Sequence, residues 1–175
     1  MLGARCREML SDLRYRWDGG QLIIAAVVTA FAAAIATIVF VAYTATTERM
    51  AEQQRRVEIR CLAVNVYHEA RGEPRLGQVA VAEVTMNRVA SPQFPDSVCR
   101  VVRQDSAFSW TMSKRTSRPT GQARQQALKV AAGVYAGEQS PVVPGALHYH
   151  ARGVDPAWAR GRTPIRTIGR HIFYP

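Results

Sequence analysis

Acidic side chains are scarce in the larger, C-terminal part of the sequence. From residue 61 onward the chain carries seven Asp and Glu against fifteen Lys and Arg, a net charge of +8. A basic surface attracts anions, and nucleic acid is one such partner. However, only two of these basic residues are lysines, and the sequence contains no nucleic-acid-binding motif. An anionic surface of another kind explains the charge equally well, and we expect no nucleic-acid partner.

Metal-ligand motifs are also missing. The sequence has neither an HExxH motif nor a cluster of cysteines. His148 and His150 form an H-x-H pair, which places both side chains on one face of a strand. Without further ligands we interpret them as hydrogen-bonding or core residues, and we expect no metal and no other cofactor.

Charge is absent from one long run near the N-terminus. Residues 22–43 contain no charged residue and only two threonines. About 20 apolar residues suffice to cross a bilayer, so we predict a single transmembrane helix rather than a core helix or a cleaved signal peptide. Residues 1–21 and 44–60 each carry four arginines, so the positive-inside rule does not decide the orientation. The mixed charges of residues 44–60 predict a polar helical stalk.

Cysteine is rare, with three residues in the chain. Cys6 precedes the predicted membrane helix, whereas Cys61 and Cys99 follow it. A pair beyond a membrane is compatible with an oxidising compartment. The residues alone leave two alternatives open, a disulfide or two buried thiols.

The most informative stretch is residues 66–88. Apolar residues recur with helical spacing at positions 59, 62, 63, 66, 67 and 70, which predicts an amphipathic helix over residues 59–71. Gly72 is a good helix stop, and Pro74 is a good start for the next helix. Glu69 falls at the edge of the apolar stripe, in the last turn before this chain reversal.

Glu69 is the candidate catalytic residue. Partial burial disfavours the charged form of a carboxylate and raises its pKa. A general acid must hold its proton near neutral pH, so this placement suits one. The alternative is a boundary carboxylate paired with Arg71 or Arg75. Glu83, in the next helix, is the competing carboxylate unless it pairs with Arg88 or lies at the surface.

The remaining sequence predicts a mainly α domain with a small β element. The second helix, after Pro74, is apolar nearly all round, which indicates burial. Residues 97–103 predict a short helix and residues 121–137 a third long one, whereas residues 106–120 are polar and irregular. Prolines and glycines exclude long helices after Glu138, and residues 146–150 and 171–174 predict short strands. We expect Trp158 and Phe173 in the core.

Nine short motifs follow one another along this domain: VYHEARGEP at 66–74, GQVAVA at 77–82, NR at 87–88, FP at 94–95, VC at 98–99, FSW at 108–110, HYH at 148–150, PAW at 156–158 and IGRHIFY at 168–174. In this order they resemble the motifs of the SleB-type cell wall hydrolases. The resemblance covers Cys61 to Pro175. That family contains spore-cortex-lytic enzymes and other peptidoglycan-cleaving proteins. One departure is Ser106-Ala107, where the family often has Gly-Gln, so a glutamine that would contact sugar is missing.

The resemblance implies a goose-type-lysozyme or lytic-transglycosylase-like domain. It implies substrate contacts from five residues, Gln78, Ser109, Trp110, His148 and Tyr149. It also favours a disulfide between Cys61 and Cys99, because the family has cysteines near both positions.

A single acidic residue favours one reaction type. A glycoside hydrolase usually needs two carboxylates, whereas Glu73 follows the helix stop and is interpreted as a capping or Arg75-pairing residue. A lytic transglycosylase needs one residue, which protonates the glycosidic oxygen and then takes the proton of the muramic C6 hydroxyl. The resemblance implies the same chemistry. The alternatives are a muramidase-type hydrolase that uses Glu83 and a catalytically silent wall-binding membrane protein.

The expected activity decides the expected topology. A domain that cleaves peptidoglycan must lie outside the inner membrane. We therefore expect residues 1–21 as a cytoplasmic tail, residues 22–43 in contact with inner-membrane lipid, and residues 44–60 as the stalk. Residues 61–175 are then the catalytic domain on the extracytoplasmic side, with peptidoglycan glycan strands as partner. The sequence leaves the oligomeric state open.

Overall fold

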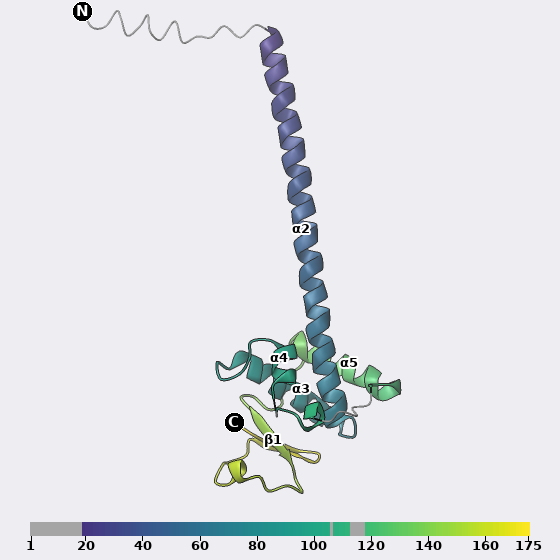
Figure 1. Cartoon of the computed structure of the whole chain (residues 1–175), viewed down its shortest axis with the longest axis vertical. Coiled ribbons are helices and arrows are strands. Elements are labelled where there is room, and N and C mark those ends of the chain that lie inside the picture. Colours follow the sequence, from purple (N-terminus) through teal and green to yellow (C-terminus); the bar gives the residue numbers. More distant parts are fainter. Residues whose placement is uncertain (1–18, 106, 113–117) are drawn as a thin grey trace, which may run out of the picture. The chain divides into compact units, whose positions relative to one another are not determined.

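The computed structural model describes residues 19–105, 107–112 and 118–175 (Figure 1). The chain divides into two compact units, residues 1–50 and residues 51–175, and helix α2 (Gly19–Ala70) has residues in both. The predicted cytoplasmic tail therefore lies almost wholly outside the described residues. The second unit contains α3 (Arg75–Ala90), α4 (Val98–Arg103), η1 (Ser109–Met112), α5 (Gly121–Tyr135), β1 (His148–Ala151), η2 (Ala157–Ala159), β2 (Arg166–Ile168) and β3 (His171–Tyr174).

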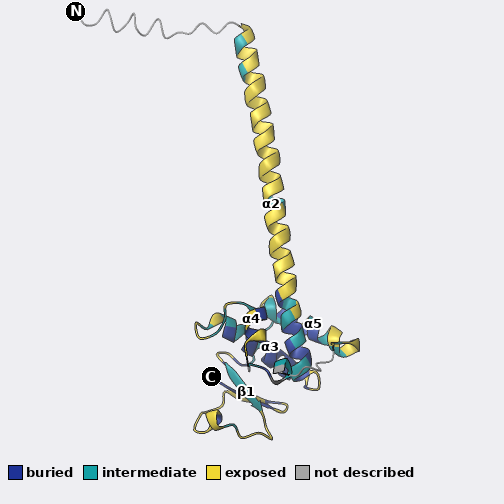
Figure 2. Cartoon of the chain, in the orientation of Figure 1, coloured by how far each residue is buried: buried dark blue, intermediate teal, exposed yellow. Residues whose placement is uncertain are grey.

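Helix α2 carries the predicted membrane segment. Among the described residues it is the one helix long and apolar enough to cross a membrane, judged by length and composition. Its large apolar side chains between Leu22 and Tyr43 are exposed (Figure 2). The helix runs without a break through the predicted stalk and ends at Ala70, one residue before the predicted end. The predicted helical stalk and the predicted 59–71 helix are therefore parts of one continuous helix.

Helix α3 is at the centre of the second unit. Its buried positions are Gly77 to Ala82, Val84, Thr85 and Arg88, so they lie on every side of the helix. One hydrophobic cluster packs α3 against the C-terminal part of α2, α4 and α5, and a second packs it against β2, β3 and residues 143–146. The prediction of a helix buried nearly all round is confirmed, since α3 separates two apolar layers.

The sheet has three antiparallel strands in the order β1-β3-β2. Tyr149 of β1 and Arg166 of β2 both pair with Phe173 of β3. Phe173 is fully buried, as expected, in the cluster that β3 shares with α3. The two predicted strands are confirmed. Strand β2 was not predicted, because its three residues include only one apolar side chain, Ile168.

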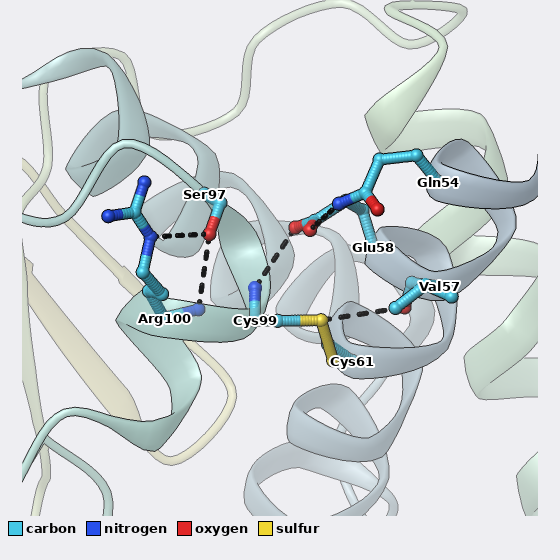
Figure 3. Close-up of a disulfide and its surroundings, with 7 residues drawn as sticks. All are labelled: Gln54, Val57, Glu58, Cys61, Ser97, Cys99 and Arg100. Carbon is cyan, nitrogen blue, oxygen red and sulfur yellow. Dashed lines mark hydrogen bonds between the residues drawn. A yellow bond between two sulfur atoms is a disulfide. The ribbon is translucent and has the colours of Figure 1, made fainter. Parts of the chain in front are cut away.

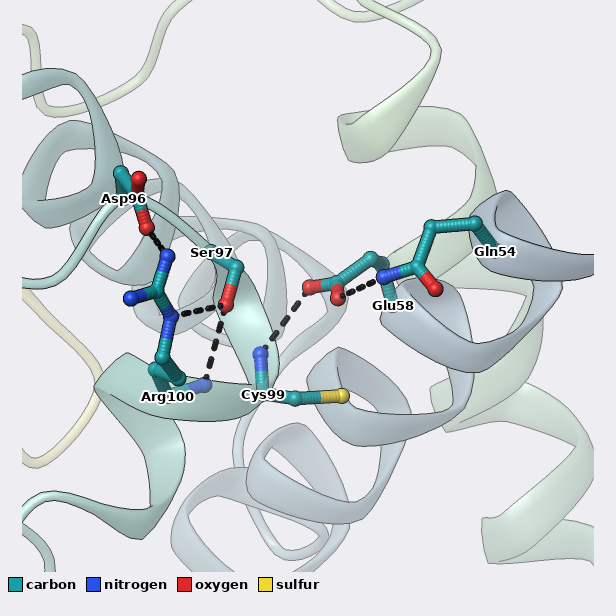
Figure 4. Close-up of polar contacts among 6 residues, drawn as sticks. All are labelled: Gln54, Glu58, Asp96, Ser97, Cys99 and Arg100. Atoms are coloured by element: carbon teal, nitrogen blue, oxygen red, sulfur yellow. Dashed lines mark hydrogen bonds and ion pairs between the residues drawn. The ribbon is translucent and has the colours of Figure 1, made fainter. Parts of the chain in front are cut away.

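Two contacts fasten α4 to α2. Cys61 and Cys99 form a disulfide with a Cα–Cα distance of 5.2 Å, which confirms the expected pair (Figure 3). The buried carboxylate of Glu58 accepts a hydrogen bond from the Cys99 backbone N–H at 3.0 Å and another from Gln54 Nε2 at 2.8 Å (Figure 4). A carboxylate at this position satisfies an N–H of the first helical turn that has no partner within the helix.

Candidate active site

Glu69 is the penultimate residue of α2, and the chain reverses directly after it. The backbone N–H of Glu73 donates to the Ala70 carbonyl at 2.9 Å, and α3 begins at Arg75 after Pro74. The predicted helix, turn and second helix are therefore confirmed. Glu69 is half-buried, as its place at the edge of the apolar stripe predicts.

The sheet supplies a hydrogen-bond partner for Glu69. The hydroxyl of Tyr149, on β1, donates to Glu69 Oε2 at 3.1 Å. Within the described residues Glu69 forms no salt bridge with Arg71 or Arg75. Arg71 instead donates to the hydroxyl of Tyr67 at 3.3 Å. Glu69 is thus not the paired boundary carboxylate that the sequence left open as an alternative.

The protonation of Glu69 is governed by its burial. Burial raises the pKa of this carboxyl group, and it is the largest influence. The hydrogen bond from Tyr149 and the positive charge of Arg88 lower the pKa and oppose it only in part. Burial and the nearby Glu69 charge raise the pKa of Tyr149 well above its usual range, so its hydroxyl stays protonated and remains a donor.

Arg88 belongs to the site, although the sequence analysis considered it only as a partner for Glu83. Its side chain is 8% exposed. The Nε atom donates to the Leu147 carbonyl at 2.8 Å, and the guanidinium carbon lies 5.2 Å from the ring centroids of Phe94 and of Phe108. A signal was available in the sequence, because Arg88 follows Val84 by four positions and so lies on a buried face of α3.

A cavity of about 280 Å³ opens beside Tyr149 and Arg88. His148 and Asp105 line it, and so does Trp158. Burial, and then the charge of Arg88, lower the pKa of His148, which favours its neutral form. The predicted sugar-binding residues His148 and Tyr149 therefore share one cavity.

Trp158 does not lie in the core, contrary to expectation. It is 40% exposed, on the short helix η2, and its ring centroid lies 5.4 Å from that of His148. The loop between β1 and β2 has few apolar residues, so no layer covers the indole ring. An aromatic ring at the mouth of a polar cavity offers a flat surface to a ligand.

Trp110 is fixed beside the end of α2. Its Nε1 donates to Asn65 Oδ1 at 3.1 Å, and its ring stacks on His68 with centroids 4.6 Å apart. Asn65 is fully buried and donates in turn to Thr85 Oγ1 at 3.2 Å. Trp110 therefore packs on the residue that precedes Glu69, and its predicted sugar contact stays a prediction.

The remaining sequence observations concern Ser106, Ser109 and Gln78. The side chain of Ser109 and the whole of Ser106 lie outside the described residues. Gln78 is buried, and its Nε2 donates to the Glu73 carbonyl at 3.0 Å, so its amide supports the turn after Glu69. A direct contact of Gln78 with sugar remains a prediction.

The neighbouring carboxylates are engaged in structural contacts. Glu73 is buried and accepts from Nε of Arg170 at 2.7 Å and from the Arg170 backbone N–H at 2.9 Å, rather than from Arg75. Glu83 accepts from the backbone N–H groups of Val142 at 2.6 Å and Val143 at 3.1 Å, rather than from Arg88. Both residues hold the C-terminal segment onto the helices.

The histidines separate into different surroundings. His150 Nε2 lies 3.1 Å from the hydroxyl of Tyr174, and the imidazole ring of His150 stacks on the ring of Tyr174. His171 is buried, and its Nδ1 has no hydrogen-bond partner in the described part of the chain. Across residues 19–105, 107–112 and 118–175, no three His, Cys, Asp or Glu side chains gather as metal ligands.

Comparison with known proteins identifies the family of this site. A model of the cell wall hydrolase family matches residues 72–174. The chain belongs to the cell wall hydrolase family. The matched segment includes Arg88 and Tyr149 and begins three residues after Glu69. The segment matched by the family model therefore does not include Glu69.

The chain is similar to curated spore cortex-lytic enzymes and to solved SleB domains. It is 40% identical over 118 residues to the enzyme of Bacillus subtilis strain 168 and 37% identical over 117 residues to that of Halalkalibacterium halodurans. Each match covers 66% of this chain but only 37% and 34% of those relatives. The chain thus spans about a third of their length.

The solved structures show the same fold. The catalytic domain of Bacillus cereus SleB matches with a TM-score of 0.58 and 35% identity, covering 67% of this chain and 89% of that one. The catalytic domain of the germination-specific lytic transglycosylase SleB of Bacillus anthracis has the same score and identity and is covered to 93%. The expected SleB-type family and the mainly α fold with a small sheet are confirmed.

Proposed function

We propose that the chain is a peptidoglycan-cleaving enzyme in which Glu69 acts as general acid and then as general base. The observation that carries this proposal is a half-buried carboxyl group with a raised pKa, which receives a hydrogen bond from Tyr149 beside an open cavity. Family membership and the names of the relatives support a wall substrate. The bond to be cut is the glycosidic bond between N-acetylmuramic acid and N-acetylglucosamine.

The proposed reaction is that of a lytic transglycosylase. Protonated Glu69 gives its proton to the glycosidic oxygen as the C1–O bond of the muramic residue breaks. The new carboxylate is stabilised by the Tyr149 hydroxyl and by the charge of Arg88. It then removes the proton of the C6 hydroxyl, whose oxygen bonds to C1 and closes a 1,6-anhydro ring. No water is consumed, and Glu69 is again protonated.

The contacts of the other carboxylates favour this chemistry over hydrolysis. A hydrolase places a second carboxylate roughly 5–10 Å from the acid. Glu73 and Glu83, the nearest in sequence, are bound to Arg170 and to two backbone N–H groups. Asp105 lines the cavity and is the residue that favours the rival, a muramidase-type hydrolase in which it activates water.

We also propose that the chain is anchored in the inner membrane by residues 22–43, with the catalytic domain on the extracytoplasmic side. Large exposed apolar side chains are costly in water, and a bilayer removes this cost. The Cys61–Cys99 disulfide supports an oxidising compartment for the domain. Fusions of a reporter enzyme to the C-terminus test this topology, since activity of a cytoplasm-only reporter would contradict it.

Substitution of Glu69 tests the assignment. The full chain, purified in detergent, is incubated with purified sacculi, and soluble muropeptides are quantified. Glu69→Gln is expected to lower the release rate at least about a hundredfold, the usual scale of general acid catalysis. Glu83→Gln, the matched control, still presents an amide oxygen to Val142 and Val143 and is expected to keep its rate. Undiminished release by Glu69→Gln would contradict the proposal, and loss in Glu83→Gln alone would move the role to Glu83.

A further inference from the structure

Arg88 is a buried cation with unused donors. Its side chain is more than nine-tenths buried. Its Nε atom is bound to the Leu147 carbonyl, but among the described residues no side chain or carbonyl accepts a hydrogen bond from its two terminal nitrogens, and no carboxylate pairs with it. The charge of Glu69 lies near enough to favour the charged form of Arg88, but buried N–H groups without acceptors are costly. The rings of Phe94 and Phe108 lie beside the guanidinium in cation–π contact, but they offer no oxygen or nitrogen acceptor to these N–H groups.

The cavity gives these donors a place for an acceptor. Arg88 and Tyr149 line it, and Asp105, which is exposed, lines it from the loop after α4. Glu69 accepts a hydrogen bond from Tyr149. Two carboxylates near one arginine disfavour an anionic ligand. The cavity thus offers both strong donors and an acceptor, which is the complement of a neutral amide.

Apolar groups complete the lining. Phe94 and Ala107 both border the cavity, and the exposed ring of Trp158 stands at its edge. An acetamido group carries a carbonyl oxygen, an N–H and a methyl group on one planar unit. Arg88 matches the oxygen, Asp105 the N–H, and the apolar side chains the methyl group. The sugar ring that bears the group then faces Trp158.

We propose that this cavity is a binding site for the acetamido group of an N-acetylated amino sugar in the glycan strand, with Arg88 as its carbonyl receptor. The inference rests on the proposed function and deepens it. It makes the N-acetyl group a requirement for productive binding beside Glu69. Arg88→Met removes the donors while keeping an unbranched apolar stem.

Binding to chemically altered walls tests this site without relying on cleavage. The full chain carrying Glu69→Gln, in detergent, is titrated onto insoluble sacculi of three kinds: N-acetylated, N-deacetylated, and deacetylated then re-acetylated. Salt at a concentration that screens the amines of the deacetylated wall is present throughout. The acetylated and re-acetylated walls are expected to bind about tenfold to a hundredfold more tightly than the deacetylated wall, the range for hydrogen bonds to a charged group.

Substitutions test which residues cause the difference in binding between the walls. Arg88→Met in the same chain is expected to bind all three walls alike, and Asp105→Ala, at an exposed position, to lose about threefold to tenfold on the acetylated and re-acetylated walls only. Glu138→Ala, exposed and remote in sequence, is the control and should bind as its parent does. Equal binding of the parent to acetylated and deacetylated walls, or binding that re-acetylation does not restore, would overturn the proposal. These outcomes need no correctly folded Arg88 variant.

The same preparations separate this inference from the proposed function. Discrimination among the walls without muropeptide release by the unsubstituted chain would leave the acetamido site in place and remove the proposed activity. Release of muropeptides from the acetylated and deacetylated walls at the same rate, with equal binding, would remove the acetamido site and leave the proposed activity in place.

Discussion

Replacing Tyr149 by Phe removes one hydrogen bond from Glu69 and leaves the ring in place. The lost O–H···O contact is 3.1 Å long, slightly longer than is usual for hydroxyl donors. At a half-buried carboxylate such a bond contributes about 1–1.5 kcal/mol. The bond lowers the pKa of Glu69, so its loss should raise that pKa.

The sign of the effect on activity follows from the role of the acid. Glu69 must be protonated to donate, so activity is present below its pKa in the folded enzyme and is lost as the pH rises through it. Since Tyr149→Phe raises this pKa further, the alkaline limb of the pH–rate profile should move to higher pH. Initial muropeptide release from sacculi, measured from mildly acidic to mildly alkaline pH, provides the profile, and carbon NMR titration of the Glu69 carboxyl group measures the pKa directly.

Two features make this prediction refutable. The ring of Tyr149 packs on Phe173 with centroids 5.6 Å apart, a contact that Phe retains, so the fold should persist. Tyr135→Phe on α5 is the matched control, because its hydroxyl makes no hydrogen bond to the described residues. An alkaline limb that stays in place or moves to lower pH in Tyr149→Phe would refute the reasoning about Glu69.

Two predictions concern stability and use chemical denaturation of the full chain in detergent. Replacing Cys61 and Cys99 together by Ser should lower the free energy of unfolding by about 2–4 kcal/mol, since the bridge closes a loop between residues 38 positions apart; identical midpoints with and without reductant would contradict this. Gly169→Ala should lower it by about 1–3 kcal/mol, because Gly169 has φ +57° and a Cβ there would collide with the carboxylate of Glu73. Gly153→Ala, in open space, should change it by no more than about 0.5 kcal/mol.

The helices and the turn beside Glu69 could be predicted because their signals are local. Apolar spacing before residue 70, Gly72 and Pro74 together specify a helix end, a reversal and a new helix. The same spacing placed Glu69 at the edge of burial. Ser97 likewise marked the start of α4, where its hydroxyl accepts from the backbone N–H of Arg100.

The partners of Glu69 could not be predicted, because they depend on contacts across the fold. Tyr149 reaches Glu69 from eighty residues away, through a sheet whose middle strand is the last in sequence. Arg88 was considered only as an alternative partner for Glu83 on the same helix, whereas packing buries its guanidinium beside two phenylalanine rings. Trp158 was expected in the core, but it is 40% exposed beside His148.

The chemical form of the cleaved ends tests the central claim most directly. Sacculi are digested to completion by the full chain, and the muropeptides are analysed by mass spectrometry without prior reduction. If Glu69 acts alone and the C6 hydroxyl attacks C1, the new ends are 1,6-anhydromuramic acid, one water lighter than hydrolysed ends. Predominantly hydrolysed, reducing ends would contradict the single-residue mechanism and would assign water activation to a second carboxylate, with Asp105 first to be tested.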